Sequence, residues 1–88
     1  MREGNYSIVI ARLKQLRNAN NLSQEEVAKY LHCTQVAYGM YELSKRKISV
    51  DRLIVLAKYY HVSLDYLAGF SDQIQVSYGA KVPDNPLE

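Results

Sequence analysis

The most constraining feature of this chain is a short pattern that occurs four times. An apolar residue precedes a Ser or Thr, and an apolar or aromatic residue stands four positions after that hydroxyl. The copies are Leu22-Ser23 with Val27, Cys33-Thr34 with Tyr38, Ile48-Ser49 with Leu53, and Val62-Ser63 with Leu67. Such a hydroxyl caps a helix by accepting from a free backbone N–H, while the flanking apolar residues pack together. Four such starts predict an all-α chain.

The pattern predicts capped helices at residues 23–32, 34–43, 49–61 and 63–69, joined by short connections. Glu26 stands three residues after Ser23 and completes a capping box there. A fifth helix is expected at residues 7–20, because apolar residues recur there at helical spacing and Ser7 can cap its start. The expected core residues are Leu13, Leu16, Val27, Ala28, Leu31, Tyr41, Leu53, Leu56, Ala57, Val62 and Leu67.

Composition limits what such a chain can be. Its 88 residues suffice for one domain, and 48% hydrophobic with 23% charged residues is typical of a globular protein. A single cysteine, Cys33, excludes an intramolecular disulfide and fits a reducing cytoplasm. No apolar run approaches the roughly 18 residues of a membrane span, so we expect no membrane partner.

The last residues differ from the rest in charge and in pattern. Residues 1–70 carry ten Lys or Arg against six Asp or Glu, a balance of +4, whereas residues 71–88 carry one against three, a balance of −2. Residues 73–78 alternate polar and apolar side chains with the period of a strand. Because a lone strand has no partner in an all-α domain, we expect a domain at 1–70 and a tail at 71–88 that is either disordered or paired with a second chain.

Two adjacent short helices, at 23–32 and 34–43, are typical of a helix-turn-helix. The chain closely resembles the Cro/CI-type (XRE) helix-turn-helix family at Leu22 to Leu31, Tyr41-Glu42, Lys45-Arg46-Lys47, Leu53 to Ala57 and Val62 to Leu67, and also at Arg12 to Arg17. The resemblance covers roughly residues 8–69. It implies a compact five-helix, lambda-repressor-like domain that binds operator DNA, usually as a symmetric dimer. Helix 34–43 would then lie in the major groove.

DNA phosphates need cations and N–H donors, and the chain has both beside the expected recognition helix. Helix 23–32 offers free N–H groups at its start, and a basic turn follows helix 34–43. The expected phosphate-contacting residues are Ser23, Thr34, Lys45, Arg46 and Lys47. The resemblance adds Gln24, which matches a family position that bonds phosphate, and it also implies a backbone contact at the basic turn. The alternative interpretation of the turn is a solvated surface loop.

Base edges need hydrogen-bond donors and acceptors on the outer face of helix 34–43. Gln35 supplies both and suits adenine. The other outward positions that the resemblance implies are Val36, Ala37 and Met40, which can meet a thymine methyl but cannot hydrogen-bond. An exposed apolar pair at Val36 and Met40 also fits a protein partner. The competing interpretation is therefore a protein-binding module, such as an antitoxin or a regulator antagonist.

Three residues depart from the family pattern. Gly39 lies inside helix 34–43 and should destabilise it by about 1 kcal/mol relative to Ala, but it permits close approach of DNA or of another helix. His32 occupies a turn position where the family usually has Gly and where a left-handed backbone is favoured. Tyr38 replaces a core aliphatic residue, so its hydroxyl needs a partner or a water molecule.

The resemblance also implies two structural roles. Arg17 and Glu42 match a pair that forms an ion pair in the family and ties the first helix to the recognition helix. The last helix region often carries the dimer contact in this family. The residues expected to do so here are Tyr66, Phe70, Ile74, Val76 and Tyr78.

Catalytic and metal chemistry find little support in the sequence. His32 and Cys33 are adjacent at a turn with no evident acid to orient them, and two His with one Cys lack zinc-ligand spacing. The four glycines are isolated, so no phosphate-binding loop is expected. We therefore expect no enzyme, no metal and no cofactor. The sequence predicts a cytoplasmic DNA-binding transcriptional regulator, a repressor-like homodimer on a palindromic operator.

Overall fold

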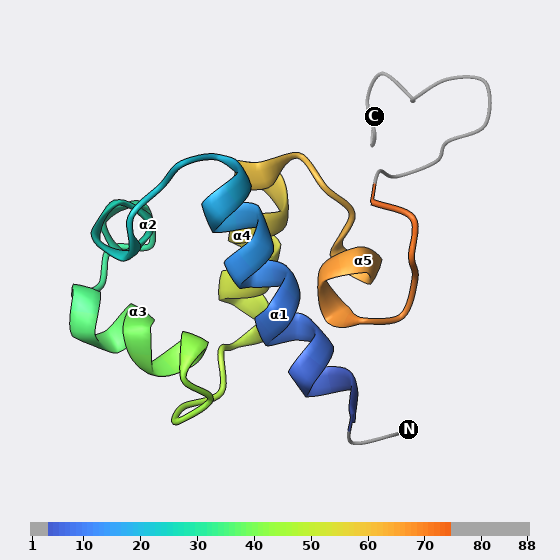
Figure 1. The fold of residues 1–88 in the computed structure, drawn as a ribbon, viewed down its shortest axis with the longest axis horizontal. Helices are drawn as coiled ribbons and strands as arrows, with labels where there is room; N and C mark the ends of the chain where they lie inside the picture. The colour runs from blue at the N-terminus through green and yellow to red at the C-terminus, as the bar shows by residue number, and fades with distance from the viewer. Residues whose placement is uncertain (1–3, 75–88) are drawn as a thin grey trace.

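The computed structural model describes residues 4–74, which form five α-helices (Figure 1). They are α1 (Gly4–Ala19), α2 (Gln24–Tyr30), α3 (Gln35–Glu42), α4 (Val50–Tyr60) and α5 (Leu64–Ala68). α1 runs through the middle of the molecule and packs against α3 and α5, while α4 packs on α5 and α2 on α3. The predicted all-α, five-helix fold is confirmed, and residues 4–74 contain no strand.

All four predicted N-caps are present. The hydroxyl of each cap residue accepts the backbone N–H three residues further on; the caps are Ser23, Thr34, Ser49 and Ser63. The Glu26 carboxylate accepts the backbone N–H of Ser23 at 2.8 Å, which completes the capping box. Because the cap residue itself has extended backbone, each helix begins one residue after it.

The expected start of the first helix is wrong. α1 begins at Gly4, so Ser7 lies within its first turns and does not cap it. Tyr6 packs against the core on the same helix face as the buried Val9, Ile10 and Leu13. Because that inward face is buried, the helix starts three residues before Ser7, the residue expected to cap it.

Each of the five helices ends with the same hydrogen-bonded motif. A residue with left-handed backbone follows the last turn, and the next residue donates its N–H to the carbonyl five residues back, at 2.9–3.0 Å. The left-handed residues are Asn21, His32, Ser44, His61 and Gly69. The expectation for His32 is therefore confirmed, with φ at 60°.

Three of the connections are short because one residue serves two helices. Leu22, Cys33 and Val62 each make the closing bond of one helix, and each immediately precedes the cap of the next. The connection between α3 and α4 differs. There Lys45 makes the closing bond and Ile48 precedes the Ser49 cap, so two further residues, Arg46 and Lys47, lie between them.

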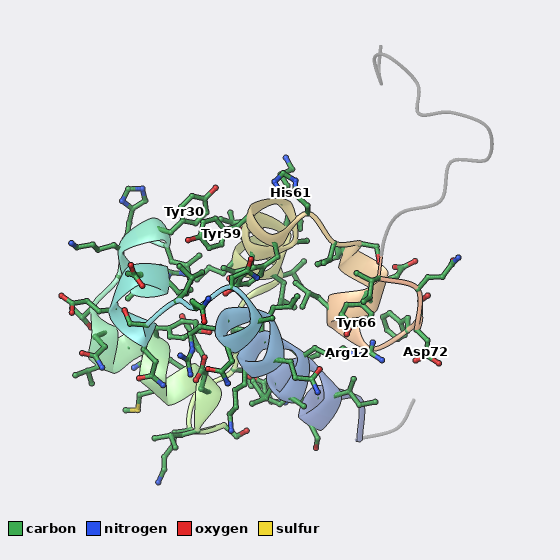
Figure 2. The ribbon with its side chains drawn as sticks, turned by 45° about the horizontal axis from the view of Figure 1, so that its top comes forward. Arg12, Tyr30, Tyr59, His61, Tyr66 and Asp72 are labelled. Carbon is green, nitrogen blue, oxygen red and sulfur yellow. The ribbon has the colours of Figure 1, made fainter. Side chains whose placement is uncertain are left out.

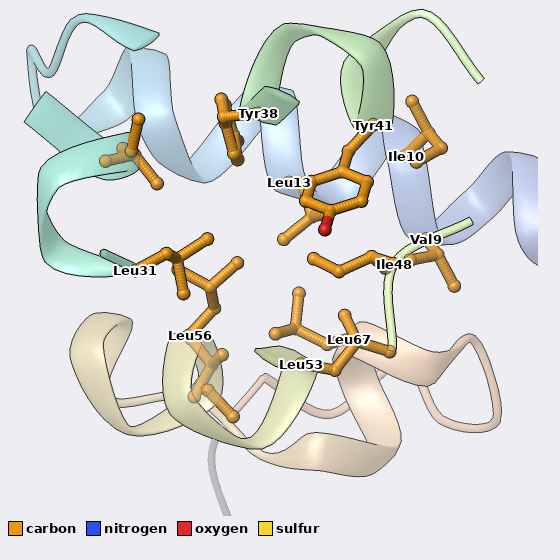
Figure 3. Close-up of a cluster of buried hydrophobic side chains, with 14 residues drawn as sticks. Val9, Ile10, Leu13, Leu31, Tyr38, Tyr41, Ile48, Leu53, Leu56 and Leu67 are labelled. Atoms are coloured by element: carbon orange, nitrogen blue, oxygen red, sulfur yellow. The ribbon is translucent and has the colours of Figure 1, made fainter. Parts of the chain in front are cut away.

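The core collects side chains from all five helices and from their connections (Figure 3). The buried apolar residues are Val9, Ile10, Leu13, Val27, Ala28, Leu31, Tyr38, Tyr41, Ile48, Leu53, Leu56, Ala57, Val62 and Leu67. Every expected core residue is among them except Leu16, which is only partly buried against the cluster. Val9, Ile10, Tyr38 and Ile48 are additions to the expected set.

The segment after α5 is fastened to the body by Arg12. Its Nη1 donates to the carbonyl of Tyr66 at 2.6 Å and to that of Ser71 at 2.8 Å, while the guanidinium lies 4.0 Å from the centre of the Tyr66 ring. Nη2 pairs with the exposed Asp72 carboxylate at 3.0 Å (Figure 2). Ser63 adds bonds to the carbonyls of residues 73 and 74. Residues 71–74 of the expected tail therefore lie against the body, and Val76 and Tyr78 lie outside the described residues.

We expect Arg12→Ala to release this segment. The bonds to two carbonyls are lost and the exposed ion pair adds little, so the free energy of unfolding should fall by about 2 kcal/mol. Amide exchange at residues 71–74 should accelerate. The matched control is Lys14→Ala, which removes an exposed cation from the same helix and should change stability by less than about 0.5 kcal/mol. Equal exchange rates in Arg12→Ala and wild type would contradict the fastening role.

Candidate nucleic-acid interface

The buried carboxylate of Glu42 lies where α1, α2 and α3 meet. Only 4% of the residue is exposed, and its two oxygens accept four hydrogen bonds. Arg17 donates Nε to Oε2 at 2.8 Å and Nη2 to Oε1 at 3.0 Å. Gln24 donates Nε2 to Oε1 at 3.0 Å, and the Tyr38 hydroxyl donates to Oε2 at 2.6 Å. The carboxylate is thus fully satisfied although it is removed from water.

The electrostatics of this cluster follow from its hydrogen bonds. Burial alone would raise the pKa of the Glu42 carboxyl, but the bonds from Arg17, Tyr38 and Gln24 outweigh it and hold the pKa below its ordinary 4.5. The bond to Glu42 raises the pKa of Arg17. Burial and the same carboxylate raise the pKa of the Tyr38 hydroxyl. Glu42 and Arg17 are therefore charged and Tyr38 is neutral at neutral pH.

The cluster fixes the position of α3 relative to the two preceding helices. The Arg17–Glu42 ion pair that the resemblance implies is present, and Arg17 Nη1 also donates to the Leu22 carbonyl at 3.0 Å. The roles of Tyr38 and Gln24 toward Glu42 were not predicted. Tyr38 and Glu42 are four residues apart on one helix, and this spacing could have predicted the bond between them. Gln24 lies on another helix, and no local pattern indicates its contact.

Gly39 allows a side chain of α2 to lie close against α3. A Cβ added there would lie 3.3 Å from Oε1 of Gln24, so the missing side chain leaves room for Gln24 against α3. Of the two uses expected for this glycine, the structure shows the contact with another helix. The same Gln24 oxygen accepts a bond of 3.5 Å from Nε2 of Gln35. A chain of side chains thus runs from the buried Glu42 through Gln24 to Gln35 at the start of α3.

The residues expected to meet bases lie at the surface of α3. Gln35 is exposed, Val36 is 73% exposed, and Ala37 and Met40 are half-buried. Leu43, which follows α3, is 66% exposed and was not predicted as part of this face. Helical spacing places Val36, Met40 and Leu43 in one row. The outer face of α3 therefore presents one amide and an apolar row.

The residues expected to contact phosphate flank α3 on both sides. Ser23 and Gln24 stand at the start of α2, and Thr34 caps α3. The two cap hydroxyls accept backbone N–H groups and keep their own protons for donation. The turn residues Lys45, Arg46 and Lys47 are exposed, and no carboxylate within residues 4–74 pairs with them.

The other residues considered from the sequence are distributed elsewhere. Tyr66 is half-buried under Arg12, while Phe70 is 70% exposed and Ile74 is 44% exposed. Cys33 packs against the core and His32 is exposed. Across the described part of the chain, no three His, Cys, Asp or Glu side chains gather in a metal-binding group. That part also lacks a helix long and apolar enough to span a membrane.

Comparison with known proteins assigns the family. Residues 13–67 match the family model described as Helix-turn-helix. The HTH-type transcriptional regulator YobD of Bacillus subtilis is 41% identical over 61 residues, which are 69% of this chain and 54% of that protein. The HTH-type transcriptional activator BcrR of Enterococcus faecalis is 29% identical over 66 residues, which are 75% of this chain and 32% of that protein. A crystal structure of a transcriptional regulator from Listeria innocua shares the fold with a TM-score of 0.67 and 25% identity, covering 78% of this chain and 64% of that chain.

The match covers more than half of the sequence, and the chain therefore belongs to the XRE-type helix-turn-helix family. The resemblance found from the residues alone is confirmed. The chain spans about half the length of YobD, at 54%, and about a third of BcrR, at 32%.

The Glu42 cluster leads to a prediction about stability. Glu42→Ala leaves the Arg17 guanidinium and the Tyr38 hydroxyl without their partner, so the free energy of unfolding should fall by about 3–5 kcal/mol. Glu42→Gln keeps the shape of the side chain and one acceptor oxygen, so the free energy of unfolding should fall by less than in Glu42→Ala. The measurement is urea unfolding at neutral pH, with Glu25→Gln as the control for removal of an exposed carboxylate.

The same cluster predicts a pH dependence. Because the pKa of Glu42 is lowered by folding, its contribution is complete above the ordinary value of 4.5 and is lost as pH falls through the folded pKa. The stability difference between wild type and Glu42→Gln should therefore shrink as pH falls below about 4.5. A difference that stays constant down to pH 2 would contradict the charged, hydrogen-bonded state of Glu42.

Proposed function

We propose that this chain is a sequence-specific DNA-binding transcriptional regulator whose α3 reads the major groove. The observation that carries the proposal is the exposure of Gln35 and Val36 on a helix fixed from beneath by the Glu42 cluster. The exposed cations that follow the helix have no carboxylate partner in the described residues, and they suit the phosphates on either side of a groove. Membership in the helix-turn-helix family supports the same function.

The chemistry of the α3 face favours A·T pairs. Gln35 can make a bidentate contact to adenine, because its second N–H and its oxygen remain available beside the bond to Gln24. Val36 and Met40 suit the methyl group of thymine. Direct readout thus rests on one amide and apolar contacts, with backbone charge supplying much of the affinity.

The proposal extends to assembly and mode of action. We expect a cytoplasmic homodimer that acts by occupying a palindromic operator, with half-sites about one helical turn, roughly 34 Å, apart. The exposure of Phe70 and Ile74 supports self-association through this end of the molecule. A repressor-like action follows if occupancy alone blocks transcription. A relative is named as an activator, and the sign of regulation is therefore tested in a reporter assay.

One observation favours a second candidate function. The row formed by Val36, Met40 and Leu43 runs from the first turn of α3 to the residue that follows the helix, and its first and last residues are 73% and 66% exposed. Such a row suits an amphipathic protein surface as well as a groove. In that function the chain is a protein-binding module, such as an antitoxin or an antagonist of another regulator.

Selection from random duplexes, followed by binding titrations at several salt concentrations, tests the proposal. We expect a palindromic site bound at least about 10³-fold tighter than random DNA, with two chains on each duplex. Gln35→Ala should lose preference at one adenine by about 1–3 kcal/mol. Lys45→Ala should weaken binding to all sequences and reduce the salt slope by about 1.

The control for Gln35→Ala is Gln15→Ala, which removes the same exposed side chain from α1 and should leave binding unchanged. Absence of any enriched site, with only weak and salt-sensitive binding, would reject the regulator in favour of the protein-binding module. In that case Val36→Glu should abolish capture of the protein partner.

A further inference from the structure

The hydroxyl of Tyr6 joins the first turns of α1 to the basic turn between α3 and α4. It donates to the carbonyl of Arg46 at 3.3 Å and accepts the N–H of Ile48 at 3.2 Å. The ammonium of Lys47 lies 5.5 Å from the centre of the Tyr6 ring. The Tyr6 hydroxyl therefore hydrogen-bonds to both peptide units that flank Lys47. It does so from a helix about 40 residues earlier in the chain.

The basic turn needs such a support because of how it departs from the other connections. Elsewhere, one residue closes one helix and precedes the cap of the next, so little backbone is left without a partner. Here Arg46 and Lys47 are additional, and within residues 4–74 the Tyr6 hydroxyl is the only group that hydrogen-bonds the backbone of residues 46–48. Ile48 is buried in the core, so its N–H is a fixed point from which the turn can be held.

We propose that Tyr6 is a positioning residue for DNA binding, which holds the turn so that Lys45, Arg46 and Lys47 face the phosphate backbone before DNA arrives. The proposal rests on the proposed function. A loop that is already ordered loses less conformational entropy on binding, and this raises affinity without adding a contact. Since phosphate contacts carry no sequence information, the gain applies equally to specific and random duplexes.

Tyr6→Phe isolates the hydroxyl, because the ring remains beneath Lys47. We expect faster amide exchange at Ile48, because both bonds of the hydroxyl are lost. Affinity should fall by about threefold to tenfold on every duplex, because the turn must then be ordered on binding. The salt slope should stay as in wild type, since the same phosphates are neutralised. Tyr59→Phe makes the same chemical change on α4, away from the turn, and should alter neither measurement.

A double-mutant cycle separates positioning from a general structural role. In a chain with Lys45→Gln, Arg46→Gln and Lys47→Gln, the turn has no cations to position, so adding Tyr6→Phe should leave DNA affinity unchanged. Titrations at low salt keep this weaker binding measurable, and circular dichroism confirms that each variant is folded. An equal affinity loss in both backgrounds would overturn the proposal, because the hydroxyl would then act independently of the cations.

Failure of the proposed function can be distinguished from failure of the positioning role of Tyr6. If wild type shows no salt-dependent binding to any duplex, the regulator is rejected and the positioning role falls with it. Exchange at Ile48 reports on the turn without DNA. An Ile48 amide that exchanges equally fast in wild type and Tyr6→Phe would overturn the positioning role even where wild type binds DNA tightly.

Discussion

The arrangement of the first three helices depends on the buried carboxylate of Glu42. Its four hydrogen bonds come from α1, α2 and α3, and removing any donor leaves charge or polarity unsatisfied in a dry environment. A buried ion pair adds little net stability over apolar packing, but loss of one partner leaves the other charge buried without compensation. The cluster also reaches the start of α3, where Gln35 is connected to the same carboxylate through Gln24.

The helices themselves are too short to be stable alone. α2, α3 and α5 have 7, 8 and 5 residues, well below the length at which an isolated helix forms in water. They persist because each start is capped by a hydroxyl, each end is closed by a left-handed residue, and every one contributes to a shared core. Where the connection is longer, between α3 and α4, the chain places three cations in a turn held by Tyr6.

Much of this fold follows from local signals in the sequence. The hydroxyl caps and most core leucines were predictable, because a cap bonds within its own first turn and an inward helix face shows as apolar residues at helical spacing. The left-handed backbone of His32 was expected from the family resemblance. Contacts between distant residues were not: Gln24 with Glu42, Tyr6 with the basic turn, and Arg12 with the segment after α5. The start of α1 was missed for the same reason, since burial of Tyr6 against distant elements outweighs the capping tendency of Ser7. Of the contacts that orient α3, the Arg17–Glu42 ion pair followed from the family resemblance, whereas the bond from Gln24 to Glu42 did not.

The proposed function requires that α3, held by Glu42 and flanked by cations, is the surface that meets DNA. NMR titration of the ¹⁵N-labelled chain with its selected duplex tests this most directly, because each backbone amide reports separately. We expect the largest shifts at residues 34–40, at the start of α2 and at residues 45–47, and no shifts at residues 51–60 of α4. Shifts confined to α5 and residues 70–74, with none on α3, would contradict it.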